Sequence, residues 1–501
     1  MSTAAAYVSP NLDDVRVRKQ RRYSMVIGGR AAEAQSGATI RRESPGHKKA
    51  IVGEWPAASR LDVENAIGAA RIAFDVGPWA NSTGAERAAL MTKLADLISH
   101  HREELALIES LEVGKPISIS RGEMDYCADL WRYAAGMARG LEGDTHNTLG
   151  PNRLGFVFRE PIGVVGIITP WNFPMIIACE RLPWAIGVGC TVVVKPSEFT
   201  SGSTIRMAQL ALEAGFPEGV FNVVTGFGNE AGQALAEDPR VDMIAFTGSV
   251  RVGKLLGAVA SNTIKRVGLE LGGKGPQIVY RDADLDAAAR TVIKGFLHNS
   301  GQVCISGSRL IVDRSIADEL LERVSEIAMR TVVGDPLNES VQMGSLISAA
   351  HLEKVVDHVE AGRRSGAKVM IGGGRLGEDH GYYFEPTIFT AARPDMSIAR
   401  EEIFGPVLTT LTFNDPSEAI DLANDTSYGL SASVWTKDLE LALNTVRRVR
   451  AGRCWINDTL DGAPELPIGG FKQSGNGRDT GRYGFDEYSE FKTLIVTLSA
   501  T

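Results

Sequence analysis

The segment from residue 164 to residue 195 reads VVGIITPWNFPMIIACERLPWAIGVGCTVVVK. It begins and ends with short β-branched runs, 164–168 and 191–194, in which polar and apolar residues do not alternate. Strands of this composition are typical of parallel sheets that are covered on both faces. Two further runs, 222–224 and 243–246, follow at similar spacing with helical segments between them. The repeated strand–helix–strand pattern predicts a parallel α/β sheet.

A second α/β series begins after Gly272. Its predicted helices cover 284–298 and 317–330, and its predicted strands cover 277–280, 310–312, 369–371, 408–413 and 433–435. Residues 143–160 have few helical signals and are interpreted as a β-hairpin arm. The apolar run 493–498 is its expected partner, because an unpaired apolar edge strand invites aggregation.

The composition describes an ordinary globular protein with a net charge of −8. Hydrophobic residues make up 44% of the 501 residues and charged residues 23%, which excludes a largely disordered chain. The acidic excess argues against a nucleic-acid-binding protein, because phosphate contacts need a basic surface. The chain contains no run of 18 apolar residues, so we expect no membrane-spanning helix.

Five cysteines are present, without a CxxC pair. This odd number in a long chain predicts neither a disulfide framework nor a structural zinc site, and we expect no metal. The N-terminus lacks a basic start followed by an apolar core and a cleavage site. These features favour a cytoplasmic protein.

Glycine-rich turns follow two of the predicted strands. Gly226-Phe227-Gly228-Asn229-Glu230-Ala231-Gly232 resembles the dinucleotide fingerprint with one extra residue before the last glycine. Phe246-Thr247-Gly248-Ser249 ends a strand and begins a helix at Val250. Free N–H groups and the dipole at a helix start suit a pyrophosphate. The simpler interpretations are a common turn for the first motif and a helix N-cap for Ser249.

The segment Lys195-Pro196-Ser197-Glu198 directly follows the run 191–194. Ligands of parallel sheets bind at the carboxyl ends of strands, so Lys195 and Glu198 could hydrogen-bond ribose hydroxyls. A carboxylate at that position would repel a 2′-phosphate, which favours NAD over NADP. Taken singly, both residues are more often surface charges.

Four other segments follow one another along the chain, and a fifth, Pro467-Ile468-Gly469-Gly470-Phe471-Lys472-Gln473-Ser474-Gly475, lies near its end. The first four are Pro170-Trp171-Asn172-Phe173-Pro174, Leu269-Glu270-Leu271-Gly272-Gly273-Lys274, Gly301-Gln302-Val303-Cys304 and Glu401-Glu402-Ile403-Phe404-Gly405-Pro406. With these motifs the chain resembles the aldehyde dehydrogenase superfamily from about residue 30 to its C-terminus.

The resemblance implies a nucleophile at Cys304, an oxyanion donor at Asn172 and a general base at Glu270. An aldehyde releases its C–H as hydride only after a nucleophile has made the carbonyl tetrahedral, and a thiolate then leaves a thioester. Asn172 would stabilise the oxyanion, and Glu270 would activate the water that hydrolyses the thioester. Acylating relatives usually lack this Glu, so its presence favours an acid product. The simpler interpretations are a buried inert thiol, a turn residue and a solvent-facing carboxylate.

A free cysteine has a pKa near 8.5, so the site must lower the pKa of Cys304 to make it a good nucleophile at neutral pH. The positive charge of the nicotinamide and a nearby helix terminus are the expected causes. The resemblance assigns Glu402 to the nicotinamide ribose, Phe404 to the nicotinamide pocket, and Lys195 and Glu198 to the adenosine ribose. The full set of expected cofactor residues is Ile168, Thr169, Pro170, Trp171, Lys195, Ser197, Glu198, Gly228, Phe246, Thr247, Gly248, Ser249, Leu271, Glu402 and Phe404.

Substrate identity is less clearly encoded. The expected substrate-pocket residues are Phe173, Ile177, Glu180, Val303, Ile305 and Asp461. Many relatives carry an aromatic residue at the position of Glu180, and semialdehyde oxidisers often carry Arg. We therefore hypothesise a preference for a cationic or amino-aldehyde. The alternatives are pairing of Glu180 with Arg181 or another Arg, and a semialdehyde as substrate.

The predicted architecture is two parallel-sheet α/β domains with a small β-hairpin arm. Residues 1–138 and 162–272 are assigned to a Rossmann-like cofactor domain, 273–473 to a catalytic domain, and 139–161 with 474–501 to an oligomerisation arm and tail. By resemblance, the protein is a homodimer or homotetramer. Two other functions stay open, a catalytically retired structural or binding homologue and a cysteine-dependent esterase. The first would have lost catalytic residues that are present here, and the second needs no nucleotide site.

Overall fold

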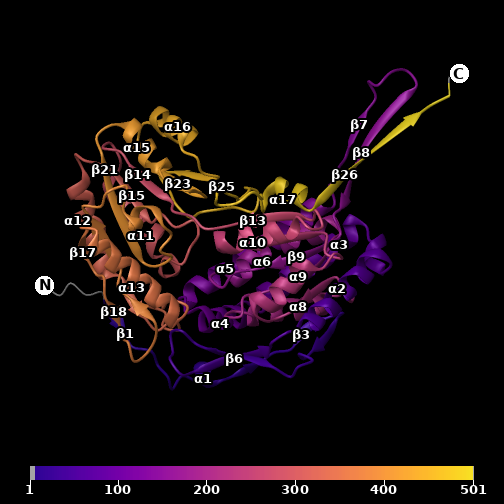
Figure 1. Cartoon of the computed structure of the whole chain (residues 1–501), viewed down its shortest axis with the longest axis horizontal. Helices are drawn as coiled ribbons and strands as arrows, with labels where there is room; N and C mark the ends of the chain where they lie inside the picture. The colour runs from indigo at the N-terminus through magenta and orange to yellow at the C-terminus, as the bar shows by residue number, and fades with distance from the viewer. Residues whose placement is uncertain (1–5, 500–501) are drawn as a thin grey trace.

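The computed structural model describes residues 6–499, so the first five residues of the predicted segment 1–138 and the last two of 474–501 lie outside it. Figure 1 shows two α/β units side by side and a β arm that projects from one of them. Each unit contains a seven-stranded sheet. Among residues 6–499, no helix combines the length and apolar character needed to cross a bilayer.

The first sheet has the order β13-β12-β9-β10-β11-β3-β4. Its five strands from β13 to β11 are parallel, and the short β3 and β4 add antiparallel pairs at one edge. The strand bounds are β13 (Arg266–Glu270), β12 (Met243–Thr247), β9 (Val164–Ile168), β10 (Thr191–Lys195), β11 (Phe221–Val223), β3 (Met25–Ile27) and β4 (Arg30–Ala32). The chain passes from β9 to β10 and β11 on one side of β9 and then crosses to β12 and β13 on the other side. This reversal makes the carboxyl end of β9 a topological switch point.

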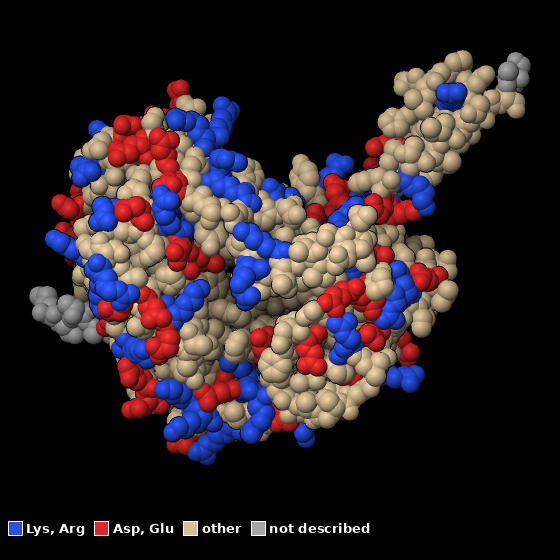
Figure 2. Space-filling model, viewed as in Figure 1, with Lys and Arg blue, Asp and Glu red and all other residues tan. Residues whose placement is uncertain are grey.

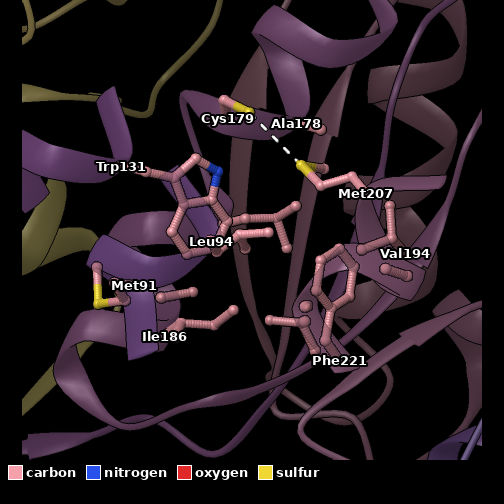
Figure 3. Packing of buried hydrophobic residues seen from close by; sticks show 14 of the residues in the cluster. Met91, Leu94, Trp131, Ala178, Cys179, Ile186, Val194, Met207 and Phe221 are labelled. Carbon is pink, nitrogen blue, oxygen red and sulfur yellow. Dashed lines mark hydrogen bonds between the residues drawn. The ribbon is translucent and has the colours of Figure 1, made fainter. Parts of the chain in front are cut away.

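Both faces of this sheet are buried, as the uninterrupted apolar runs predict. Val165 and Ile167 of β9 pack into the larger core on one face, and Val164 and Ile168 pack into the core on the other. Figure 3 shows part of the larger core, in which Trp131, Leu94 and Phe221 pack together. That core involves α3 (Gly84–His100), α4 (Arg102–Val113), α5 (Ile117–Ala138), α6 (Pro174–Cys179), α7 (Leu182–Val188) and α8 (Gly202–Ala214), and the opposite core involves α2 (Arg60–Asp75), α9 (Gln233–Glu237) and α10 (Val250–Ala260).

The second sheet has the order β17-β20-β21-β15-β14-β23-β24, and all its pairs are parallel except β17 with β20. The strand bounds are β17 (Lys368–Ile371), β20 (Thr387–Thr390), β21 (Val407–Phe413), β15 (Arg309–Asp313), β14 (Pro276–Val279), β23 (Ser431–Trp435) and β24 (Arg453–Ile456). Three hydrophobic cores belong to this unit. One contains residues of α11 (Leu285–Leu297) and α12 (Ala317–Arg330), and a second contains residues of α13 (Ala349–Arg364) and α14 (Ser397–Arg400). The third contains residues of α15 (Pro416–Asn424), with side chains of α16 (Leu439–Arg448) packed against it.

The predicted pairing of the hairpin arm with the end of the chain is confirmed. β26 (Ser489–Thr497) pairs antiparallel with β8 (Arg153–Pro161) along nine residues, and β8 also pairs with β7 (Asp144–His146). The arm exposes a group of large apolar side chains, and its outer part is mostly uncharged in Figure 2. These exposed side chains are Leu149, Phe158, Phe491, Leu494, Ile495 and Leu498.

Smaller elements complete the chain. β1 (Ala6–Val8) runs parallel to β16 (Val332–Gly334), so the start of the described chain contacts the second α/β unit. The remaining bounds are α1 (Val15–Arg18), β2 (Arg21–Arg22), β5 (Thr39–Glu43), β6 (Ile51–Pro56), η1 (Pro78–Asn81), η2 (Gly228–Gly232), η3 (His298–Gly301), β18 (Arg375–Leu376), β19 (Tyr383–Phe384), β22 (Tyr428–Gly429), β25 (Phe471–Lys472) and α17 (Gly481–Glu487).

Candidate active site

A cleft of about 260 Å³ lies where the carboxyl ends of β9, β12 and β13 meet segments of the second unit. It brings together motifs that are more than 200 residues apart in the sequence. The lining residues are Pro170, Trp171, Asn172, Ile177, Thr247, Gly248, Ser249, Leu271, Gly272, Cys304, His351, Lys354, Glu402 and Phe404. The candidate nucleophile and oxyanion donor therefore share one cleft with several expected cofactor residues.

Cys304 follows α11 and η3 and is partly buried at the cleft. Burial raises the pKa of its thiol to about 12, and the carboxylates of Glu402, Glu180 and Glu270 contribute in the same direction. This environment opposes the expected lowering of the pKa in the protein alone. Burial and these carboxylates therefore favour the neutral thiol in the protein alone.

Asn172 is 4% exposed and is fixed by two amide hydrogen bonds. Its Nδ2 donates to the carbonyl of Gln302 at 2.9 Å, and Asn299 Nδ2 donates to the Asn172 carbonyl at 3.0 Å. Because a carboxamide carries two N–H groups, one remains available for an oxyanion. Within residues 6–499, the Cys304 N–H also makes no hydrogen bond, so two donors are free near the thiol.

Glu270 ends β13 with its backbone fixed and part of its carboxylate free. Gly248 N–H donates to the Glu270 carbonyl at 3.0 Å, and Leu271 N–H donates to the Ser474 carbonyl at 2.8 Å. An isolated bridge to Gly475 covers the same edge of the strand. Within the described part of the chain, Glu270 Oε1 has no hydrogen-bond partner. Burial, followed by repulsion from Asp479, raises the pKa of this carboxyl well above its ordinary value, as expected for a general base in a protected site.

The end of β10 carries the predicted ribose-binding residues. Lys195 Nζ is buried and donates to the carbonyls of Pro196 at 2.7 Å and Gly226 at 2.9 Å. Burial lowers the pKa of Lys195 to about 8. The half-buried Glu198 carboxylate lies 3.9 Å from this amine, and Ser197 is buried beside them. Gly228 begins the η2 turn after β11.

The strand–turn–helix at β12 has the geometry expected of an anion site. The helix α10 begins at Val250 as predicted, and Ser249 caps it by accepting a hydrogen bond from Val252 N–H, which agrees with the simpler interpretation of this residue. A Cβ at Gly248 would lie 2.4 Å from the Phe246 ring, so only glycine allows this approach of the turn to the ring. Within residues 6–499, the buried hydroxyls of Thr169 and Thr247 have no hydrogen-bond partner, which leaves polar groups free at the ends of β9 and β12.

Glu402 and Phe404 also line the cleft. Glu402 Oε1 accepts from Gly273 N–H at 2.8 Å, and burial raises the pKa of this carboxyl to about 7. Phe404 has φ +60°, and its carbonyl accepts from His351 Nε2 at 2.7 Å. Its ring packs edge-on against Trp171, with ring centroids 5.3 Å apart.

His351 and Lys354 line the cleft but were missing from the sequence-based site. Both belong to α13, and a lone His or Lys on an amphipathic helix gives no signal of a binding site. Tertiary packing alone brings this helix to the cleft.

An apolar cluster lies next to Asn172 and Cys304. It contains Phe173, Ile177 and Val303 with Ile176, Ile305 and Leu460 packed against them. These contacts include four of the six expected substrate-pocket residues.

The two acidic residues of the expected pocket have different surroundings. Glu180 is 8% exposed, and burial raises its pKa to about 7. Arg181 pairs with Asp479 at 2.9 Å, and the charges of Arg453 and Arg181 still act on Glu180, where they oppose the rise of its pKa. Asp461 is exposed and pairs with Lys294, outside the apolar cluster.

Comparisons with known proteins identify the family of the chain. The model of the Aldehyde dehydrogenase family matches residues 32–494. A crystal structure of an NAD-dependent aldehyde dehydrogenase from Sinorhizobium meliloti is 63% identical, with a TM-score of 0.98 over 99% of this chain and 98% of the other. An NAD+ complex of aldehyde dehydrogenase from Bacillus cereus is 39% identical, with a TM-score of 0.95 over 98% and 100% of the two chains. Betaine aldehyde dehydrogenase of Bacillus subtilis is 44% identical over 436 residues, or 86% of this chain and 89% of the relative. The chain therefore belongs to the aldehyde dehydrogenase family and is an aldehyde dehydrogenase enzyme.

Proposed function

We propose that this enzyme oxidises an aldehyde to the carboxylic acid with NAD as the hydride acceptor. The observation that carries the proposal is the convergence of Cys304 and Asn172 on one cleft with the turn 247–249 and with Glu402. Two free N–H donors beside a thiol suit acyl chemistry, and glycine-supported N–H groups at a helix start suit a pyrophosphate.

The residues present fit a dinucleotide. The unpartnered hydroxyls of Thr169 and Thr247 and the close turn at Gly248 provide a polar cradle at the switch point of the sheet. Lys195 and Glu198 would hold the adenosine ribose, and the Glu198 carboxylate would disfavour the 2′-phosphate of NADP. Two structural relatives, an NAD-dependent aldehyde dehydrogenase and an aldehyde dehydrogenase solved as an NAD+ complex, support the same choice.

Glu402 and Phe404 would position the nicotinamide end, and Ile168, Pro170, Trp171, Ser197, Gly228, Phe246, Ser249 and Leu271 complete the proposed cofactor contacts. When bound, NAD supplies the acceptor for the hydride that leaves the substrate carbon, and its positive charge would offset the three carboxylates that keep the Cys304 thiol protonated.

The protein's own residues then divide the reaction. The Cys304 thiolate, formed by loss of the Sγ proton to water, bonds to the aldehyde carbon as the π bond of the carbonyl breaks, and the carbonyl oxygen takes the negative charge of a thiohemiacetal. The free Asn172 N–H and the Cys304 backbone N–H stabilise this charge. Loss of hydride from the carbon leaves a thioester on Cys304. Glu270, with its raised pKa and free Oε1, takes a proton from the water that attacks this thioester, and the acid and the free thiol are released.

The substrate proposal rests on the position and charge of Glu180. Its carboxyl is close enough to Cys304 to raise the pKa of that thiol, and Arg181 is engaged by Asp479. Burial and repulsion from Asp479 outweigh the attraction of Arg453 and Arg181, and a buried carboxylate near the thiol favours a cationic or amino-aldehyde. A semialdehyde, which carries its own carboxylate, is the alternative and would be repelled.

We propose that the chain divides into a cofactor-binding domain, a catalytic domain and an oligomerisation arm with a tail. Residues 1–138 and 162–272 would bind the cofactor, and 273–473 would carry the nucleophile. Residues 139–161 and 474–501 would form the arm through which copies of the chain assemble into a homodimer or homotetramer. The exposed apolar side chains of the arm support this role, because a large apolar surface is costly to leave in water.

The test is NADH absorbance at 340 nm with a panel of aldehydes, for the wild type and Cys304→Ala. We expect turnover only with Cys304, and equal NAD affinity of the two proteins by calorimetry. Aldehyde oxidation by the variant would show that a residue other than Cys304 is the nucleophile. Release of acid from esters without NADH formation would favour the esterase alternative, and inactivity towards all aldehydes would favour a retired homologue.

A further inference from the structure

The turn that leads into Cys304 has a strained backbone. Asn299, Ser300 and Gly301 have φ values of +46°, +57° and +73°. Residues other than glycine seldom adopt this region, and Asn tolerates it better than most. Two such residues in succession persist only where surrounding contacts hold them, and Asn299 and Ser300 are both almost completely buried.

The side chain of Asn299 makes contacts that reach the oxyanion donor. Its Nδ2 donates to the Asn172 carbonyl at 3.0 Å and lies 3.4 Å from the Gln302 carbonyl. Asn172 Nδ2 donates to the same Gln302 carbonyl at 2.9 Å. The main chain and the side chain of Asn172 are thus both tied to the turn that precedes Cys304.

This turn is itself anchored to a separate segment. Gln302 Nε2 donates to the carbonyls of Asn299 at 3.0 Å and Ser345 at 3.3 Å, and its Oε1 accepts from Ile347 N–H at 2.9 Å. Ser300 Oγ donates to the Gly344 carbonyl at 2.9 Å. The amide of Asn299 is therefore a link between a well-anchored turn and the loop after β9.

We propose that Asn299 is a positioning residue that keeps the Asn172 amide aligned with the Cys304 thiol. It acts through Asn172 and makes no contact with the reacting atoms. The inference rests on the proposed function, in which Asn172 stabilises the oxyanion. Small errors in alignment have large effects on rate, since a misplacement of about 1 Å can cost about 10²-fold.

The variant Asn299→Gly tests the proposal, because glycine keeps the left-handed conformation available while the side chain and its amide are removed. We expect kcat to fall by up to about 10²-fold, the cost of a misplacement of about 1 Å, with KM for NAD little changed. Asn424→Ala is the matched control. The Asn424 side chain also joins two backbone positions, Arg448 and Arg450, but at the end of α15, so its loss should leave kcat unchanged.

A double-mutant cycle separates positioning from general support of the fold. In an Asn172→Ala background, Asn299→Gly should lower kcat by less than about twofold, because residues that act through one another are not additive. Independent, multiplying losses would overturn the proposal.

A crystal structure of Asn299→Gly gives a readout that does not need turnover. We expect the Asn172 amide to leave the Gln302 carbonyl, and an unmoved Asn172 would overturn the proposal. If the wild type oxidises no aldehyde, the proposed function fails, and the crystal structure still decides whether Asn299 positions Asn172.

Discussion

The charge of Glu180 should make substrate preference depend on pH in a defined direction. Burial raises the pKa of this carboxyl to about 7, so it is about 10% ionised at pH 6 and about 90% ionised at pH 8. A cationic substrate group about 4 Å from the carboxylate would gain about 1–4 kcal/mol, or about fivefold to 10³-fold in kcat/KM. The preference should therefore rise by up to about ninefold between pH 6 and pH 8.

The assay compares betaine aldehyde with 3,3-dimethylbutanal, a neutral aldehyde of the same shape. The ratio of their kcat/KM values cancels the ionisation of Cys304 and Glu270, since both substrates need the same chemistry. Glu180→Gln should remove the pH dependence of this ratio. The ratio should also fall, because the glutamine side chain carries no charge that could favour betaine aldehyde. Succinic semialdehyde should be the poorest of the three substrates in the wild type.

Two results would refute this reasoning. A ratio that stays constant from pH 6 to pH 8 in the wild type would show that Glu180 does not meet the substrate or does not titrate there. Faster turnover of succinic semialdehyde than of betaine aldehyde would reverse the proposed charge preference.

Three other substitutions test separate parts of the site. Glu270→Gln should lower steady-state turnover by about 10²–10⁴-fold and leave a first-turnover burst of NADH in stopped flow, because the lost base acts on thioester hydrolysis; disappearance of the burst would place Glu270 in an earlier step. Glu198→Gln should lower KM for NADP by about five- to tenfold with little change for NAD, and an unchanged KM for NADP would remove this carboxylate from the ribose site. Asp479→Ala leaves the Arg181 guanidinium buried without its partner and should lower the free energy of unfolding in urea by about 3–5 kcal/mol, whereas a loss below about 1 kcal/mol would mean that another carboxylate compensates.

Strands buried on both faces could be predicted well from the sequence. The run 164–168 matches β9, and 191–194 falls within β10, because β-branched residues without polar interruptions suit only the inside of a covered sheet. β13 was not predicted. Its residues Arg266–Glu270 include charged ends and partly exposed positions, since it is an edge strand whose outer side is covered by the tail near Gly475.

The candidate site likewise contains residues that the sequence predicts and residues that only tertiary packing reveals. Cys304 and Asn172 stand in short motifs with a specific composition, so they could be singled out before their packing was known, and the cleft brings both together. His351 and Lys354 reach it only through the packing of α13. The raised pKa of Cys304 also depends on three carboxylates that are distant in the sequence, so no local pattern could have predicted its direction.

The cover that the tail provides for the Glu270 strand has a consequence for biosynthesis. Leu271 bonds to Ser474, and Asn476 bonds to Leu269, across about 200 residues of intervening chain. A nascent chain from which residue 476 has not yet emerged already contains all strands of both seven-stranded sheets, but it lacks the hydrogen bonds between the tail and the strand of Glu270. We therefore expect competence for acid release to be acquired only after residue 476 has left the ribosome, when the cofactor fold has already formed.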